Sequence, residues 1–278
     1  WADALPASAL AGAVDGPLLL VAKDAVPSEV LTELRRLGAV KAYIVGGTSV
    51  ISDTVRDVLL GEGLTVERVA GSSRYETSQK IATTVEALVD GSTPLVFLAT
   101  GQNFPDALAA SSISANMAAP ILLTYSGSIP AETDAALRAL RPSRIVVCGG
   151  ETTISSAVMG QLGSADYGWP IVERKGGLTR YETAALLVDR GRSLTGAIEP
   201  DGVYLATGQN YPDALAGGVL AGIGGSEWRP LMLTPSTTLG SDAQDVITAH
   251  SSMRFVTVLG GTSTMSDTVK DQEQDLLP

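Results

Sequence analysis

Short apolar segments alternate with amphipathic segments along the whole chain. Residues 94–100 (PLVFLAT), 120–124 (PILLT) and 144–150 (RIVVCGG) are apolar runs, as in strands that are buried on both faces. Between them lie residues 103–117 and 131–142, whose apolar side chains recur at helical spacing. Because strands and helices alternate, the pattern predicts parallel sheets covered by helices on both faces, with right-handed crossovers.

Polar residues predict where several helices begin. Ser73 and Glu76 have the spacing of a capping box, as do Thr179 and Glu182, so a helix is expected to start at each pair. Asn103 is expected to cap the next helix along the chain, which has a proline in its first turn.

The same order of segments occurs three times. The motif LATGQNFPDALAAS at 98–111 recurs at 205–218 as LATGQNYPDALAGG, and WADALPAS at 1–8 matches its second half. Aligned on Trp1, Phe104 and Tyr211, the copies are 103 and 107 residues apart, which is the size of a small domain and longer than a solenoid repeat. We therefore predict three tandem α/β modules with parallel sheets of flavodoxin-like or Rossmann-like character. Their expected boundaries are residues 1–66, 67–172 and 173–278.

The three modules differ in completeness. Apolar segments at 17–20, 120–123 and 230–233 correspond to one another, and each module has a double glycine after a later strand. The motif RYET occurs only at 74–77 and 180–183, so the first module lacks this helix and the LATGQN strand that follows it. We expect that one set of these two elements is missing from the chain, or is supplied by residues upstream of Trp1.

Composition narrows the classes of function. The net charge of −11 disfavours general nucleic-acid binding and contact between a basic patch and a membrane. No run of about 18 apolar residues occurs, so no helix that spans a bilayer is expected. The single cysteine, Cys148, lies in an apolar run, where a buried and inert thiol is expected.

Side chains for common catalytic sites are scarce. The single histidine, His250, has no equivalent in the other copies and is expected at the surface. A Ser-His-Asp triad, a zinc site or a Cys-His pair would need groups that the chain lacks, so no cofactor and no metal are expected. A carboxylate pair for glycoside cleavage stays open because 30 acidic residues are present. Repetition of one weak site favours multivalent binding instead.

Two arginines stand at unusual positions. Arg74 and Arg180 occupy the first position of the RYET helices, where a positive charge opposes the helix dipole. Each therefore needs a partner, which is either a carboxylate across a module boundary or an anionic ligand that the guanidinium binds. Asp106 and Asp213 are candidate carboxylates, and they can also satisfy the backbone amides at the start of their own helices.

The motifs RYET, ATGQN(F/Y)PDAL, P(I/L)LL and VGG…IS, in this order and spacing, resemble the cell-wall-binding repeat type 2 family of Gram-positive surface and S-layer-associated proteins. The resemblance covers essentially the whole chain as three consecutive repeats. It implies a pseudo-threefold trimer of modules and a secreted, non-catalytic anchor at the cell surface. Such an anchor holds an exported protein non-covalently on anionic secondary cell-wall polymers, such as teichoic-acid-like glycans.

The resemblance also implies a set of polymer-binding residues, which lie in the apolar segments and near the clefts between modules. They are Arg74, Arg180, Asn103, Asn210, Asp3, Asp106, Asp213, Pro17, Leu18, Leu19, Leu20, Pro120, Ile121, Leu122, Leu123, Pro230, Leu231, Met232 and Leu233.

Several alternatives stay open at this point. The apolar segments also fit buried central strands, whose mutation would impair binding by unfolding a module. A net charge of −11 should repel a polyanion, unless positive potential is concentrated at Arg74 and Arg180, a divalent cation bridges acidic groups, or the ligand is less anionic. The alternative function is a structural assembly protein of a surface layer or filament, and a wall-glycan hydrolase ranks third.

Overall fold

The computed structural model describes residues 2–91, 93–196, 199–223 and 228–277. Trp1, on which the first copy was aligned, lies outside these ranges. Strands and helices alternate as the sequence predicts, and every pair of hydrogen-bonded strands is parallel. The expected α/β class with three parallel-sheet modules is therefore confirmed.

The strands form three separate sheets, which we call the first, second and third sheet. The first contains β1 (Lys41–Val45) and β2 (Thr65–Val69). The second has the order β4-β3-β5-β6, from β3 (Leu95–Thr100), β4 (Ile121–Thr124), β5 (Arg144–Cys148) and β6 (Ile171–Lys175). The third has the order β8-β7-β9, from β7 (Gly202–Thr207), β8 (Leu231–Thr234) and β9 (Phe255–Val258).

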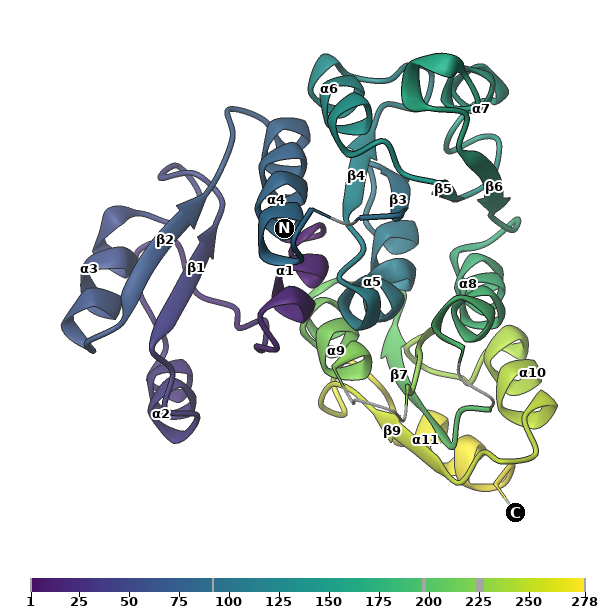
Figure 1. The fold of residues 1–278 in the computed structure, drawn as a ribbon. Coiled ribbons are helices and arrows are strands. Elements are labelled where there is room, and N and C mark those ends of the chain that lie inside the picture. The colour runs from purple at the N-terminus through teal and green to yellow at the C-terminus, as the bar shows by residue number, and fades with distance from the viewer. Residues whose placement is uncertain (1, 92, 197–198, 224–227, 278) are drawn as a thin grey trace.

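Helices cover these sheets and join them (Figure 1). They are α1 (Ala7–Ala13), α2 (Ser28–Arg36), α3 (Asp53–Gly61), α4 (Arg74–Leu88), α5 (Pro105–Met117), α6 (Ala131–Leu140), α7 (Ser156–Leu162), α8 (Arg180–Thr195), α9 (Pro212–Gly222), α10 (Ser241–Ala249) and α11 (Asp267–Gln274), with a short 3-10 helix at Ala165–Tyr167.

The RYET helices contact the sheet that follows them in the chain. Helix α4 packs on β4 and α6, and α8 packs on β8 and α10. The strands before these helices belong to the preceding sheet, because β2 pairs with β1 and β6 pairs with β5. The expected module boundaries fall within β2 and β6.

Three equivalent helices, α1, α5 and α9, meet in the middle of the molecule and contact one another. Small residues allow this close approach: a Cβ at Gly12 would overlap the backbone of Ala115, and Gly222 lies against the same turn of α5. The Ser8 hydroxyl donates to that of Ser114 over 3.0 Å, and the Asn116 amide donates to the Gly222 carbonyl over 3.0 Å. The three lobes are therefore arranged about a shared helical centre, as the pseudo-threefold prediction requires.

The largest buried cluster extends from the second sheet through α5 to the third sheet, from Phe97 and Leu108 to Leu205 and Leu231. The first sheet has a smaller cluster of its own around Ile44 and α3. Cys148 is fully buried, and burial raises the pKa of its thiol well above the ordinary value, as expected of an inert cysteine. No helix within the described ranges is both long and apolar enough to cross a membrane.

The predicted helix starts are partly right. The Ser73 and Thr179 hydroxyls each accept a hydrogen bond of 3.1 Å from the backbone N–H three residues later, which confirms both residues as N-caps. Asn103 does not cap α5, because the N-cap is Phe104 and the Asn103 side-chain oxygen accepts from the Phe104 N–H over 2.9 Å. The Asn103 side chain is instead used within the turn that precedes the helix.

Two further expectations are wrong. Residues 17–20 form no strand, although the equivalent residues form β4 and β8. Those strands pair with β3 and β7, and the described part of the first sheet has no strand in that position. His250 is 5% exposed instead of lying at the surface, because it packs at the end of α10 with its Nδ1 2.6 Å from a Glu199 carboxylate oxygen.

Candidate functional site

Parallel sheets place binding sites beyond the carboxyl ends of their strands. At these ends the three sheets meet along three boundaries, which we call seams. The first seam contains α1 and α4, and the second contains α5 and α8. The third lies between α9 and residues 17–20.

At the first two seams an arginine fixes the TGQN turn. The Nη1 atom of Arg74 donates a hydrogen bond to the Gly101 carbonyl, and that of Arg180 donates to the Gly208 carbonyl. The rings of Tyr75 and Tyr181 lie so close to the same glycines that any added Cβ would collide with them. The partner required by these arginines therefore includes a backbone carbonyl, which neither sequence alternative proposed.

Arg180 also lies beside the helix of the other lobe. Its guanidinium carbon is 5.8 Å from the centroid of the Phe104 ring, which is within cation–π range. Its charge also acts on Asp106. Burial raises the pKa of the Asp106 carboxyl, and hydrogen bonding from Thr183 and the positive charge of Arg180 act in the opposite direction. The second seam is thus closed by contacts among Arg180, Thr183, Phe104 and Asp106.

The three equivalent aspartates lie at equivalent turns. Asp106 lies against Gly149 and Asp213 lies against Gly260, in both cases so close that a Cβ on the glycine would touch the carboxylate. Asp3 is the neighbour of Gly46 in the same way, at a longer distance. These glycines have φ values of 116° at Gly46, 114° at Gly149 and 109° at Gly260, which favour glycine. The aspartates therefore face inward, towards the double-glycine turns.

The TGQN turns carry exposed uncharged polar groups. Asn103 and Asn210 are exposed, and each accepts a hydrogen bond from the next backbone N–H, at 2.9 Å and 2.8 Å. Each side chain still presents an amide NH₂, which can donate. Gln102 and Gln209 beside them are also exposed, and Gln102 accepts from the Ser126 hydroxyl over 2.8 Å. We call residues 102–103 and 209–210 the polar edges of the second and third sheets.

The apolar segments differ between the copies. Residues 120–123 and 230–233 are buried, with β4 under α4 and β8 under α8, which fits the alternative that these segments are structural. Met232 fills the same buried strand position as Leu122. In contrast, Leu18 and Leu19 are half-buried and Leu20 is 39% exposed. A role of all these residues in polymer binding stays a prediction.

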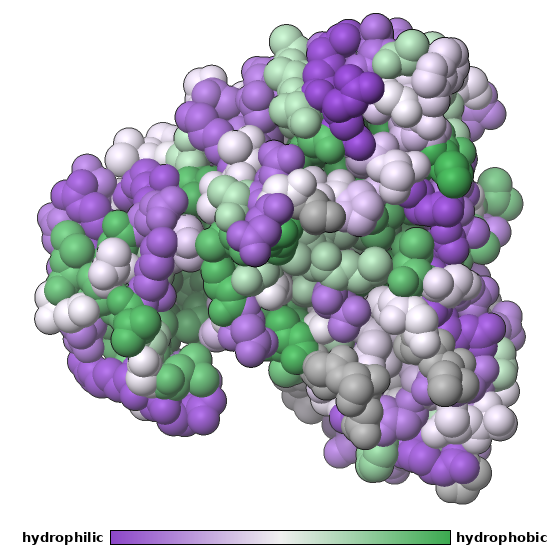
Figure 2. Space-filling view, viewed as in Figure 1, coloured by the Kyte–Doolittle hydropathy of each residue, from purple (hydrophilic) through white to green (hydrophobic). Residues whose placement is uncertain are grey.

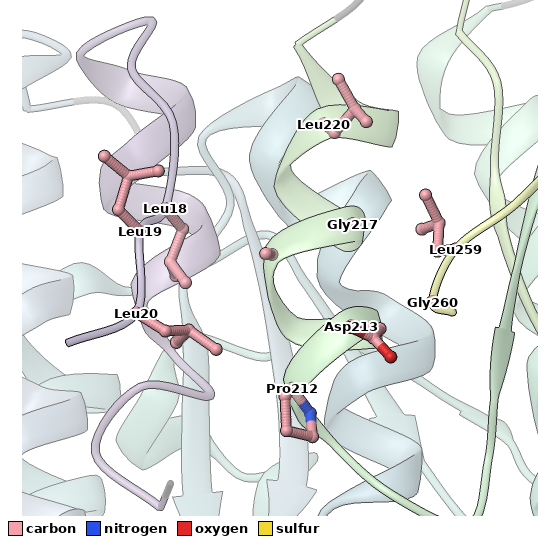
Figure 3. Close-up of a pocket in the computed structure, with 10 residues that line it drawn as sticks. Leu18, Leu19, Leu20, Pro212, Asp213, Gly217, Leu220, Leu259 and Gly260 are labelled. Atoms are coloured by element: carbon pink, nitrogen blue, oxygen red, sulfur yellow. The ribbon is translucent and has the colours of Figure 1, made fainter. Parts of the chain in front are cut away.

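An apolar cleft of about 460 Å³ opens at the third seam (Figure 3). One wall is the segment of residues 18–20, and the opposite wall is one face of α9 with the double-glycine turn after β9. Figure 2 shows the hollow between the lobe of the first sheet and that of the third, with hydrophobic surface inside it. The lining residues are Leu18, Leu19, Leu20, Pro212, Asp213, Ala216, Gly217, Leu220, Leu259 and Gly260.

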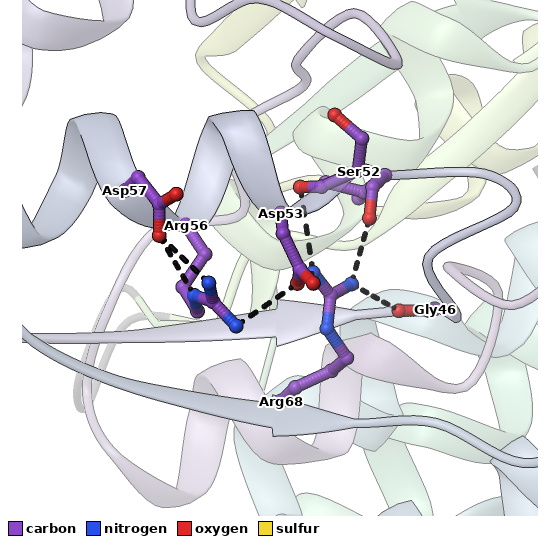
Figure 4. A network of polar contacts seen from close by, with 7 residues as sticks. Gly46, Ser52, Asp53, Arg56, Asp57 and Arg68 are labelled. Atoms are coloured by element: carbon purple, nitrogen blue, oxygen red, sulfur yellow. Dashed lines mark hydrogen bonds and ion pairs between the residues drawn. The ribbon is translucent and has the colours of Figure 1, made fainter.

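A second pair of arginines, which the sequence analysis missed, braces the double-glycine turns. Figure 4 shows Arg68 on β2, whose Nη1 donates to the carbonyls of Gly46 and Ile51 over 2.8 Å each. At the equivalent turn, Arg174 on β6 donates from Nη1 to the Gly149 carbonyl and from Nη2 to the Ile154 carbonyl, over 2.7 Å each. The available signal was the repeated V-E-R at the end of both strands. Within the described ranges, no three His, Cys, Asp or Glu side chains form a group that could hold a metal ion.

Comparison with known proteins finds similarity along most of the chain. The sequence profile of cell wall binding domain 2 (CWB2) matches residues 1–56, 68–159 and 174–270. The solved structure of Cwp8 from Clostridium difficile superposes with a TM-score of 0.81 at 26% identity, over 100% of this chain and 46% of that one.

Two proteins of Bacillus subtilis are also similar. The chain is 30% identical over 272 residues to the N-acetylmuramoyl-L-alanine amidase LytC, which covers 98% of this chain and 51% of LytC. It is 28% identical over 273 residues to the amidase enhancer, which covers 98% of this chain and 35% of that protein. The chain thus spans about half of LytC and about a third of the amidase enhancer.

Proposed function

Because this chain belongs to the cell wall binding domain 2 family, we propose that it is a non-catalytic module that attaches the exported protein carrying it to anionic secondary polymers of the cell wall. The amidase activity in the name of LytC belongs to a protein of which this chain spans 51%, so we do not assign it to this chain. The module acts at the cell surface and needs no cofactor.

The repetition of the polar edges carries this proposal. Asn103 and Asn210 are exposed at the carboxyl ends of equivalent strands in two sheets. Side-chain amides donate and accept hydrogen bonds, as polysaccharide hydroxyls do. One such edge supplies a weak contact, and two edges on one rigid molecule combine into firmer attachment to a repeating polymer.

The anionic groups of the polymer would lie near Arg74 and Arg180. Both guanidiniums bond to the carbonyl of the glycine directly before each polar edge. At physiological salt the Debye length is about 8 Å, so the positive charge of a nearby arginine outweighs more distant acidic residues. Local positive potential thereby reconciles an anionic partner with a net charge of −11.

We test the polar edges with the double variant Asn103→Ala and Asn210→Ala. Each lost side chain removes hydrogen bonds worth about 0.5–1.5 kcal/mol, so retention on purified cell walls should fall about 5-fold or more. The control is Gln161→Ala with Gln274→Ala, two exposed amides on α7 and α11. Pelleting assays with both variants should show loss only for the asparagine pair, with melting temperatures unchanged. Equal retention of the two variants would remove the polar edges from the binding site.

A further inference from the structure

An exposed aromatic ring lies beside the polar edge of the second sheet. Tyr125 directly follows β4 and is 43% exposed. The Gly101 N–H donates to the Thr124 carbonyl over 2.9 Å, so Tyr125 begins level with the polar edge on the neighbouring strand. The Ser126 hydroxyl donates to the Gln102 side-chain oxygen over 2.8 Å and ties the two turns together. The ring and the polar edge therefore lie together at the carboxyl ends of β3 and β4.

A second ring fixes the position of Tyr125. The ring centroids of Tyr75 and Tyr125 are 4.4 Å apart, and the ring planes are inclined by 56°. Tyr75 is buried, and its ring lies so close to Gly101 that a Cβ there would come within 2.6 Å of it. Tyr125 thus packs on a buried ring while a large part of its own surface stays exposed to solvent. A side chain held in this way loses little conformational freedom when a ligand covers it.

The fold does not require an aromatic residue at this position. In the third sheet, Tyr181 lies against Gly208, and the Gly208 N–H donates to the Thr234 carbonyl over 2.9 Å, as at the equivalent positions of the second sheet. The next residue there is Pro235, which is the equivalent of Tyr125. The same turn therefore forms without an exposed ring, and Tyr125 is a feature of the second sheet alone among these two.

Two opposite charges act on the pair of rings. Burial is the largest cause that raises the pKa of Tyr75, and the neighbouring Tyr125 adds to it. The positive charge of Arg74 lowers this pKa, whereas the negative charge of Glu132, at the start of α6, raises it. The rings thus stand between a guanidinium and a carboxylate. Such surroundings do not select an anion, and they suit an uncharged group.

A pyranose residue combines the features that this surface would bind. Its C–H groups carry a slight positive charge and pack on the negative face of an aromatic ring, while its hydroxyls exchange hydrogen bonds with side-chain amides. We propose that Tyr125 is a stacking platform for an uncharged pyranose residue of the polymer, whose hydroxyls bind the amides of Gln102 and Asn103. This inference rests on the proposed function and adds recognition of a sugar ring, which the third sheet lacks.

The first test leaves the protein unchanged. The full chain is oxidised by hydroxyl radicals with and without the soluble polymer that acid extraction releases from cell walls, and the oxidised peptides are quantified by mass spectrometry. Bound polymer should slow the oxidation of Tyr125 about fivefold or more, because stacking covers the exposed ring. Trp169 is the control. It is 72% exposed and precedes β6, at the opposite end of the same parallel sheet, so it should react equally in both samples.

The second test separates ring stacking from other contacts of Tyr125. Tyr125→Leu removes the ring and should weaken binding of the same polymer, measured by titration calorimetry, about 3-fold to 10-fold. Tyr125→Phe keeps the ring and should bind within about twofold of the parent. The loss for Tyr125→Leu should be the same in about 50 mM and about 500 mM salt, because salt does not screen an uncharged contact. Trp169→Leu is the matched control and should bind as the parent does.

The outcomes distinguish this inference from the proposed function. Polymer that binds but leaves Tyr125 unprotected would overturn the inference and leave wall attachment standing. Equal losses for Tyr125→Phe and Tyr125→Leu would assign the contact to the hydroxyl, and a loss confined to low salt would assign it to charge, so either result would contradict stacking. A parent chain that does not bind the polymer would overturn both proposals.

Discussion

At the scale of single residues, glycines set how closely the central helices approach. A Cβ at Gly12 would overlap the Ala115 carbonyl oxygen across the α1–α5 contact. Gly12→Ala should therefore destabilise the protein by about 1–3 kcal/mol through overpacking, measured by denaturant unfolding.

Gly160→Ala on α7 is the matched control, because a Cβ there meets nothing within 4 Å. This substitution should be neutral or stabilising by about 0.5–1 kcal/mol, since glycine is costly within a helix. Equal effects of the two substitutions would mean that the helical centre is less tightly packed than described.

Glu76 supports the start of α4 through its charge. The Ser72 backbone N–H and hydroxyl donate to its carboxylate over 2.6 and 2.7 Å, and Lys80 lies 3.0 Å away. These groups lower the pKa of Glu76 from 4.5 to about 2, with the backbone hydrogen bond as the largest cause. A lowered pKa means that the carboxylate stabilises the fold above pH 4.5, and that this stability is lost as the pH falls towards 2.

Glu76→Gln should therefore melt a few degrees below the parent at pH 7, and the two proteins should converge as the pH falls from about 4.5 towards 2. Glu86→Gln, near the other end of the same helix, is the control. A difference between Glu76→Gln and the parent that is constant from pH 7 to pH 3 would contradict the assignment.

At the scale of elements, the start of each RYET helix is coupled to the turn after the next strand. Arg180→Ala removes a donor from the buried Gly208 carbonyl and should cost about 1–3 kcal/mol of unfolding free energy. Arg56→Ala, whose partners are exposed carboxylates on α3, should cost much less. If the unfolding free energy of Arg180→Ala equals that of the parent, the arginine is not a brace, whatever the effect on wall retention.

The elements themselves could be predicted from the sequence because apolar strands, helical periodicity and capping boxes are local signals. The wrong predictions concern residues whose conformation depends on other parts of the chain. Residues 17–20 are as apolar as residues 120–123, but a strand needs a paired strand, and the described first sheet offers none there. Asn103 has the residue type of a cap, but Phe104 takes the cap position before Pro105.

The candidate site was harder to predict than the fold. The sequence identified Arg74 and Arg180 as residues that need a partner, but their partners include a backbone carbonyl that is brought close only by folding. The contact between His250 and Glu199 could not be predicted from the sequence, because the two residues are 51 positions apart and neither belongs to the repeat.

At the scale of the whole molecule, three lobes around one helical centre present equivalent strand ends in fixed relative positions. Such rigidity suits a long repeating ligand, because each additional contact is made without further ordering of the protein. Helices α4 and α8 close the first and second seams, whereas the third seam contains the cleft. Under the proposed function, the polar edges of the second and third sheets would be two equivalent contacts for one polymer chain.

The most direct test of this account is sedimentation of the chain with purified cell walls, before and after acid extraction of the secondary polymers. If those polymers are the ligand, the chain pellets with intact walls and stays in the supernatant with extracted walls. Pelleting that is undiminished after extraction would contradict attachment to these polymers.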